Sequence, residues 1–63
     1  MKLATTPCTR IDDSTYQVNG DDRLVLIHKN DDGLWELSID GDHIRTFHTK
    51  AVANSFYTAE HRV

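Results

Sequence analysis

The fold is decided by residues 35–41, which read Trp-Glu-Leu-Ser-Ile-Asp-Gly. Apolar and polar residues alternate from Trp35 to Asp40, and this period of two is typical of a strand with one buried face and one wetter face. Asp40 and Gly41 then form the two-residue turn signal of a β-hairpin. The stretch therefore predicts a strand that turns tightly into a second strand.

Turn signals made of Asn, Asp and Gly recur along the chain, at residues 19–22, 30–33 and 40–42. These residue types favour turns because they tolerate positive φ or bond their own backbone. The segments between the turns are rich in β-branched and aromatic residues, which favour strands. They predict four strands, at residues 15–18, 23–29, 34–39 and 43–47.

The apolar period changes from that of a strand to that of a helix after Thr49, which is a candidate N-cap. Apolar residues then recur at helical spacing at Val52, Phe56, Ala59 and Val63. This pattern predicts an amphipathic helix of about three turns. The predicted fold class is α+β, a four-stranded antiparallel meander sheet with one C-terminal helix packed on one face.

The loop at residues 30–33 sets which residues of the sheet are buried, because a shift of one residue exchanges the two faces. A four-residue loop places Leu26 opposite Leu37, and the tight turn at residues 40–41 places Leu37 opposite Ile44. The core under the helix then consists of Leu24, Leu26, Trp35, Leu37, Ile39, Ile44, Val52 and Phe56, with Tyr16, Val18 and Ala59 beside them. A three-residue loop with a glycine bulge at Gly33 would instead bury Val25 and Ile27.

The sheet face opposite the helix is apolar for a surface in the first of these two registers. It carries Val25, Ile27, Leu34 and Phe47, together with the cations Lys29 and Arg45. An open apolar face favours docking of another protein or of a second copy of the chain, and we expect a homodimer to be marginal because ordering two subunits costs several kcal/mol. The alternative cover for this face is the N-terminal segment with Leu3 and Ile11.

The chain has 63 residues, seven Lys and Arg against ten Asp and Glu, and a net charge of -3. A chain this short has room for one core, so we expect one domain over residues 14–63, preceded by a flexible arm over residues 1–13. The single Cys8 excludes an intramolecular disulfide and favours a reducing, cytoplasmic location. No stretch is apolar for long enough to predict a membrane span.

The acidic residues and histidines predict neither a metal site nor catalysis. The acids of the first and third turns share one end of the predicted meander and form an acidic rim suited to a basic partner, at Asp21, Asp22, Asp40 and Asp42. Turn chemistry alone accounts for these aspartates, and no stretch matches a calcium-binding loop or the spacing of zinc ligands. We find no phosphate loop and no set of nucleophile and base, so we expect no metal, no cofactor and no enzymatic activity.

Residues 35–41, together with residues 44–56, which read Ile-Arg-Thr-Phe-His-Thr-Lys-Ala-Val-Ala-Asn-Ser-Phe, resemble part of a known family. They are similar to the closing hairpin and helix of the amino-terminal arm-binding domains of phage and transposon integrases, which read DNA with a three-stranded sheet. The resemblance implies that Arg23, Lys29 and Arg45 contact the groove and phosphates of DNA. The chain departs from that family in lacking a basic amino-terminal tail and in its excess of acids.

These observations favour a small noncatalytic protein-binding module that docks through its open sheet face. The resemblance and the size suggest an accessory or regulatory protein encoded by a phage or another mobile element. The alternative is a DNA-binding module that uses the sheet face. A sequence pI near 5.7 disfavours nucleic acid, because DNA binding depends on neutralising phosphates.

Overall fold

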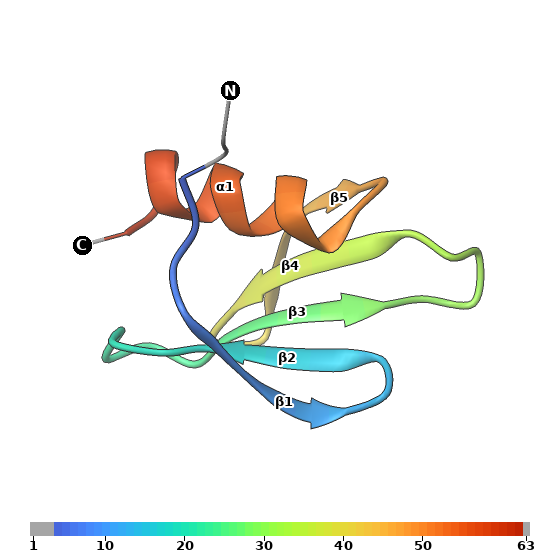
Figure 1. Cartoon of the computed structure of the whole chain (residues 1–63), viewed down its shortest axis with the longest axis horizontal. Helices are drawn as coiled ribbons and strands as arrows, with labels where there is room; N and C mark the ends of the chain where they lie inside the picture. The colour runs from blue at the N-terminus through green and yellow to red at the C-terminus, as the bar shows by residue number, and fades with distance from the viewer. Residues whose placement is uncertain (1–3, 63) are drawn as a thin grey trace.

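The computed structural model describes residues 4–62, and these residues form one antiparallel sheet and one helix (Figure 1). In chain order the elements are β1 (Cys8–Asp12), β2 (Thr15–Val18), β3 (Val25–Lys29), β4 (Trp35–Ile39), β5 (Asp42–Phe47) and α1 (Lys50–Glu60). Strands that follow one another in the chain are neighbours in the sheet. The α+β class and the C-terminal helix are confirmed, but the sheet has five strands where the sequence predicted four.

The additional strand, β1, comes from the segment expected to be a flexible arm. Cys8 pairs with Val18 and Arg10 pairs with Tyr16, and a bulge at Ile11 bends the strand before it turns into β2. Asp12 stabilises that turn by accepting a hydrogen bond of 2.8 Å from the backbone N–H of Ser14. The prediction that residues 1–13 form a flexible arm is therefore wrong for residues 8–12, which form β1. Residues 1–3 of the expected arm lie outside the described range.

Buried hydrogen bonds tie the segment before β1 to the helix. The backbone N–H of Thr6 donates to the side-chain oxygen of Asn54 at 2.9 Å, and the Asn54 side-chain nitrogen donates to the Thr6 carbonyl at 2.8 Å. The Thr6 and Thr58 hydroxyls lie 2.8 Å apart. Because these groups pair mutually, the chain crosses from the helix to the sheet edge without leaving buried donors unsatisfied.

The β3–β4 hairpin adopts the second of the two registers derived from the sequence. Asn30 and Leu34 close the loop through a backbone hydrogen bond of 2.8 Å, and Gly33 takes the φ of +79° that a glycine bulge requires. Ile27 consequently faces Leu37, and Val25 and Ile27 are both 0% exposed. The pairing of Leu26 with Leu37 is wrong, and Leu26 faces Ser38 on the opposite side of the sheet.

The β4–β5 hairpin has the predicted two-residue turn but not the predicted pairing. Asp40 and Gly41 have φ of +52° and +87°, as a tight turn between antiparallel strands demands. A bulge at Ile44 then shifts the register, so that Arg45 and not Ile44 faces Leu37. Arg45 and Phe47 therefore lie on the helix side of the sheet, which corrects their expected place on the open face.

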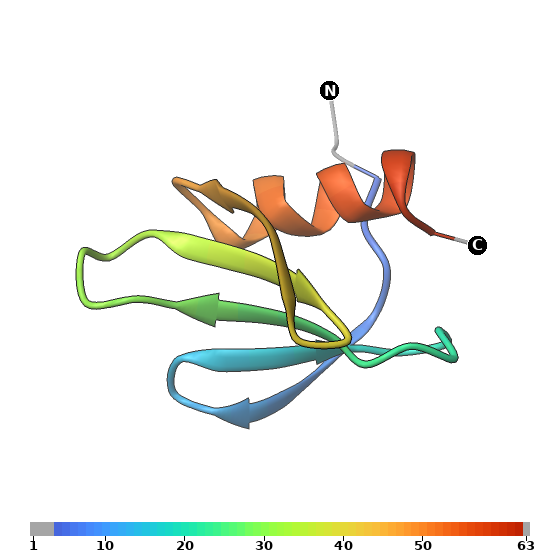
Figure 2. The same ribbon diagram turned by 180° about the vertical axis from the view of Figure 1, so that it is seen from behind.

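Helix α1 packs on one face of the sheet, over β3, β4 and β5 (Figure 2). Its N-cap is confirmed, because the Thr49 hydroxyl accepts a hydrogen bond of 3.1 Å from the Val52 N–H. The buried helix face consists of Ala53, Asn54 and Tyr57. The predicted face is rotated by about one residue, which leaves Val52 and Ala59 exposed, and Val63 lies outside the described residues.

The core is made by residues from three strands, β2 to β4, and the helix: Val18, Val25, Ile27, Leu37, Ile39, Ala53 and Tyr57. Three of the strand residues, Val18, Leu37 and Ile39, were predicted. Leu24 was predicted to be buried but is 48% exposed. Trp35 is half-buried with its ring 5.9 Å from that of Tyr16, so it packs at the end of the core rather than at its centre.

Candidate functional site

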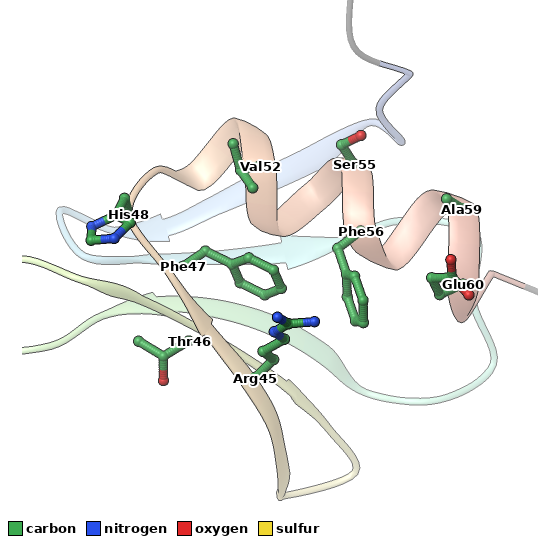
Figure 3. A pocket seen from close by; sticks show the side chains of 9 residues that line it. All are labelled: Arg45, Thr46, Phe47, His48, Val52, Ser55, Phe56, Ala59 and Glu60. Atoms are coloured by element: carbon green, nitrogen blue, oxygen red, sulfur yellow. The ribbon is translucent and has the colours of Figure 1, made fainter.

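A groove of about 620 Å³ runs between the edge strand β5 and helix α1 (Figure 3). One wall is the end of β5 and the residue after it, and the other wall is the outer face of α1. The lining residues are Arg45, Thr46, Phe47, His48, Val52, Ser55, Phe56, Ala59 and Glu60. The bulge at Ile44 places Arg45 and Phe47 on the helix side of the sheet, and the burial of Ala53, Asn54 and Tyr57 leaves Val52 and Phe56 beside them.

The floor of the groove is aromatic. The rings of Phe47 from β5 and Phe56 from α1 are tilted against each other with centroids 5.2 Å apart. Both are only half-buried, and Val52 beside them is 43% exposed. The apolar stripe of the helix predicted from the sequence is thus real, but it lines a surface groove instead of filling the core.

Arg45 provides the positive charge of the groove. Figure 3 shows its side chain reaching toward the rings of Phe47 and Phe56, and the guanidinium carbon lies 5.9 Å and 5.5 Å from the two ring centroids. Such a cation is held by the negative faces of the rings. The described residues provide no carboxylate within ion-pair distance of Arg45, since the two ion pairs among them are Arg10–Asp13 and Arg23–Asp21.

The six residues predicted to bind a partner are dispersed by the structure. Val25 and Ile27 are core residues and cannot form an open docking face, which is a correction that follows from the register of β3. Leu34 is half-buried in the β3–β4 loop, and Lys29 is exposed at the end of β3. Arg45 and Phe47 are brought together in the groove.

The sheet face opposite the helix is mostly polar, contrary to the prediction. Gln17 and Ser38 flank Leu26 across the strands, and His28 faces Glu36 next to them. The sequence reasoning missed the helix side of the groove. The available signal was the stripe of Val52, Phe56 and Ala59, which was assigned to the core because an apolar helical stripe usually is buried.

The aspartates of the expected acidic rim differ in what holds them. The Asp21 carboxylate accepts hydrogen bonds from the Arg23 guanidinium at 2.8 and 3.0 Å and from the Tyr57 hydroxyl at 2.5 Å. These donors, Arg23 first and Tyr57 second, hold the pKa of Asp21 far below its ordinary value. Burial, followed by the bond to Asp21, raises the pKa of Tyr57.

This network fastens the β2–β3 loop to the helix. Arg23 also donates a hydrogen bond of 2.5 Å to the carbonyl of His61 at the end of α1. Asp40 accepts a hydrogen bond of 2.9 Å from the Leu24 N–H, whereas Asp22 and Asp42 are exposed. Two of the four rim carboxylates are therefore engaged within the fold.

Two exposed histidines on the strands are paired with hydroxyls: His28 with Thr15 and His43 with Thr46, each at 2.9 Å. Burial raises the pKa of the Cys8 thiol, which accepts a hydrogen bond of 3.1 Å from the Asn54 side chain. Across residues 4–62, no three His, Cys, Asp or Glu side chains gather in a cluster that could hold a metal ion. The one helix in that range is too short and too polar to cross a membrane.

The fold and the groove define a small α+β domain with one edge strand exposed beside a helix. Comparison of the chain with protein-family models, with curated proteins and with solved structures gave no match. The three cations that the integrase resemblance implies for DNA lie in the β2–β3 loop, at the end of β3 and on β5. Arg23 is bound to Asp21 and His61, while Lys29 and Arg45 face Trp35 and Leu37 on the helix side.

Proposed function

We propose that this protein is a small noncatalytic module that binds another protein through the groove between β5 and α1. One observation carries the proposal: Val52 and Phe56 on the helix and Phe47 on β5 lie side by side at the surface, and each keeps part of its apolar surface exposed. Val52 is 43% exposed, and Phe47 and Phe56 are half-buried beside it. Apolar surface rimmed by polar residues is typical of interaction sites.

The polar groups of the groove favour binding over catalysis. Arg45, His48, Ser55 and Glu60 line it, and within residues 4–62 none of the four side chains is hydrogen-bonded to another. The Thr46 hydroxyl, which also lines the groove, lies 2.9 Å from Nε2 of His43, but within residues 4–62 no third group is hydrogen-bonded to that imidazole to orient it as a base. The free Cys8 supports a reducing compartment such as the cytoplasm, and the integrase resemblance supports an accessory role in a mobile element.

The test is a titration of the ¹⁵N-labelled protein with peptides selected from a displayed random library. We expect shifts to concentrate at residues 45–48 and 52–60. Two matched variants place a charge on an exposed aliphatic residue: Val52→Asp in the groove and Ile11→Asp on the opposite sheet edge. Binding should be lost in Val52→Asp and retained in Ile11→Asp.

Three results would overturn the proposal. Binding that is lost only in Ile11→Asp would move the contact to β1. Self-association in sedimentation that Val52→Asp abolishes would make a second copy the occupant of the groove. The absence of any selected peptide, combined with duplex DNA that shifts the sheet amides at physiological salt, would establish the DNA-binding alternative.

A further inference from the structure

We infer that the occupant of the groove is an extended peptide that joins the sheet as a sixth strand beside β5 and brings a carboxylate to Arg45. This inference rests on the function proposed above and adds the chemistry of the partner. If the partner strand runs antiparallel to β5, its sequence contains, from the N-terminal side, an apolar residue, then any residue, and then Asp or Glu. Four features of the groove lead to this pattern.

The first feature is the edge itself. β5 is the last strand of the sheet and has one strand neighbour, β4, among the described residues. Its bulge lies at Ile44 near the turn, and residues 45–47 pair with β4 in regular register. An edge strand of this kind presents unpaired N–H and C=O groups, and an added strand satisfies them.

The second feature is the unmatched charge. Arg45 is exposed, lies over two aromatic rings and has no ion-pair partner within residues 4–62. The rings restrict the guanidinium, which lowers the entropy lost when it binds an anion. Its planar fork of N–H donors matches a carboxylate, so the chemistry favours an acidic side chain at this point of the partner.

The third feature is the spacing. Arg45 and Phe47 are two residues apart on one strand and therefore lie on the same face. A strand placed beside them turns two of its own residues, also separated by one, toward the same face. Antiparallel pairing is slightly the more stable arrangement, and it puts the residue beside Phe47 before the residue beside Arg45.

The fourth feature is the apolar half of the groove. Phe47, Phe56 and Val52 surround the position beside Phe47, and an aliphatic or aromatic side chain there would remove their exposed surface from water. Glu60 lines the groove from the last turn of the helix, about two turns beyond Val52, so its negative charge lies at the other end of the groove from this apolar position (Figure 3).

The experiment uses NMR titration of the intact chain with the probe peptide Gly-Ser-Thr-Ile-Thr-Glu-Thr-Ser-Gly. Three altered probes replace Glu by Gln, exchange Ile and Glu, or methylate the nitrogen of the central Thr. Two protein variants remove one cation from each sheet edge: Arg45→Gln on β5 and the matched control Arg10→Gln on β1. We expect the Gln probe to bind the wild type about tenfold more weakly, as for a lost charge-assisted hydrogen bond.

Arg45→Gln should bind the Glu and Gln probes equally, while Arg10→Gln should keep the wild-type preference. The exchanged and methylated probes should bind more weakly than the original. Equal binding of the Glu and Gln probes to the wild type, or undiminished binding of the methylated probe, would overturn this inference. If either result is found and Val52→Asp still blocks the selected peptides, the inference fails and the proposed function stands. If no peptide binds in the groove at all, both the inference and the proposed function are overturned.

Discussion

The two edge strands of the sheet, β1 and β5, differ in what protects them. β1 carries a bulge at Ile11 and charged side chains, among them Arg10 paired with Asp13, and all its residues after Cys8 are exposed. Bulges and charges are common defences of an edge against unwanted pairing. β5 has its bulge near the turn, and the regular end of the strand lies beside an apolar groove. The β1 edge thus carries such defences, and the regular end of the β5 edge borders the groove in which we propose that a partner binds.

The largest effect should come from testing the register on which this comparison depends. Ile27→Ala should destabilise the protein by about 2–5 kcal/mol, because it opens a cavity at a fully buried position, and a domain this small should then unfold. Leu24→Ala, at a residue that is 48% exposed, should change stability by about 0.5 kcal/mol. Urea denaturation followed by circular dichroism measures both. The reverse order would restore the β3–β4 register that places Leu24 in the core.

A second prediction separates the two edges directly. Asn54→Ala removes the side chain that pairs with both backbone groups of Thr6, and leaving a buried donor and acceptor unpaired should cost about 1–3 kcal/mol each. Hydrogen exchange should accelerate first in β1 and later in β5. Ser55→Ala, the neighbouring helix position in the groove, is the control and should leave β1 protected. Earlier loss of protection in β5 would contradict the assignment of Thr6 and Asn54 to the β1 edge.

A third prediction concerns the junction of β5 and α1. Thr49→Ala removes the hydroxyl that caps the Val52 N–H and should cost about 1 kcal/mol. Thr49→Ser keeps the cap and should restore most of the loss. Thermal denaturation measures the stability, and amide shifts of residues 50–53 report fraying. If Thr49→Ala and Thr49→Ser behave alike, the cap does not hold the groove wall.

The smallest effect at neutral pH is expected from the Asp21 carboxylate, whose contribution to stability changes only in acid. Because hydrogen bonds from Arg23 and Tyr57 hold the pKa of Asp21 well below 3.8, the unfolded chain takes up this proton first as the pH falls. The stability contributed by Asp21 is therefore intact above about pH 5 and is lost progressively below about pH 4. Urea midpoints measured across that range should fall for the wild type as the pH is lowered.

Two variants at the β2–β3 loop sharpen the acid test. Asp21→Asn should flatten the decline in acid, because the titrating group is gone. Asp22→Asn, at the exposed neighbour, should retain it. Equal acid sensitivity in Asp21→Asn and the wild type would show that the contact between the loop and Tyr57 does not depend on the charge of Asp21.

Local patterns predicted the local structure well. The tight turn at Asp40 and Gly41, the N-cap at Thr49 and the alternation through Trp35, Leu37 and Ile39 are all governed by residues close in the chain. The extra strand β1 escaped prediction because its stability comes from pairing with β2 and from the bonds between Thr6 and Asn54, which are 48 residues apart. Sequence periodicity does not report contacts of that range.

The candidate site was predicted only in part. Arg45 and Phe47 were both singled out, but their face depended on the one-residue bulge at Ile44, as the face of Val25 and Ile27 depended on the bulge at Gly33. A bulge moves every later side chain of its strand to the other face while the sequence pattern stays almost the same. The helix stripe was recognised, yet its amphipathic pattern is compatible with two rotations that differ by one residue.

Local sequence patterns were enough to predict the class of fold, the turns between β2 and β5 and the start of the helix. They also singled out the residues of the groove: Arg45 and Phe47 near the end of β5, and the apolar stripe of the helix. Long-range contacts were needed to establish which residues of β3 and β5 lie on the helix side of the sheet and which helix residues are buried. Tyr57 settles the second question, because its ring fills the core while its hydroxyl reaches Asp21. With Tyr57 in the core, Val52 is 43% exposed and Phe56 is half-buried, and both line the groove beside β5.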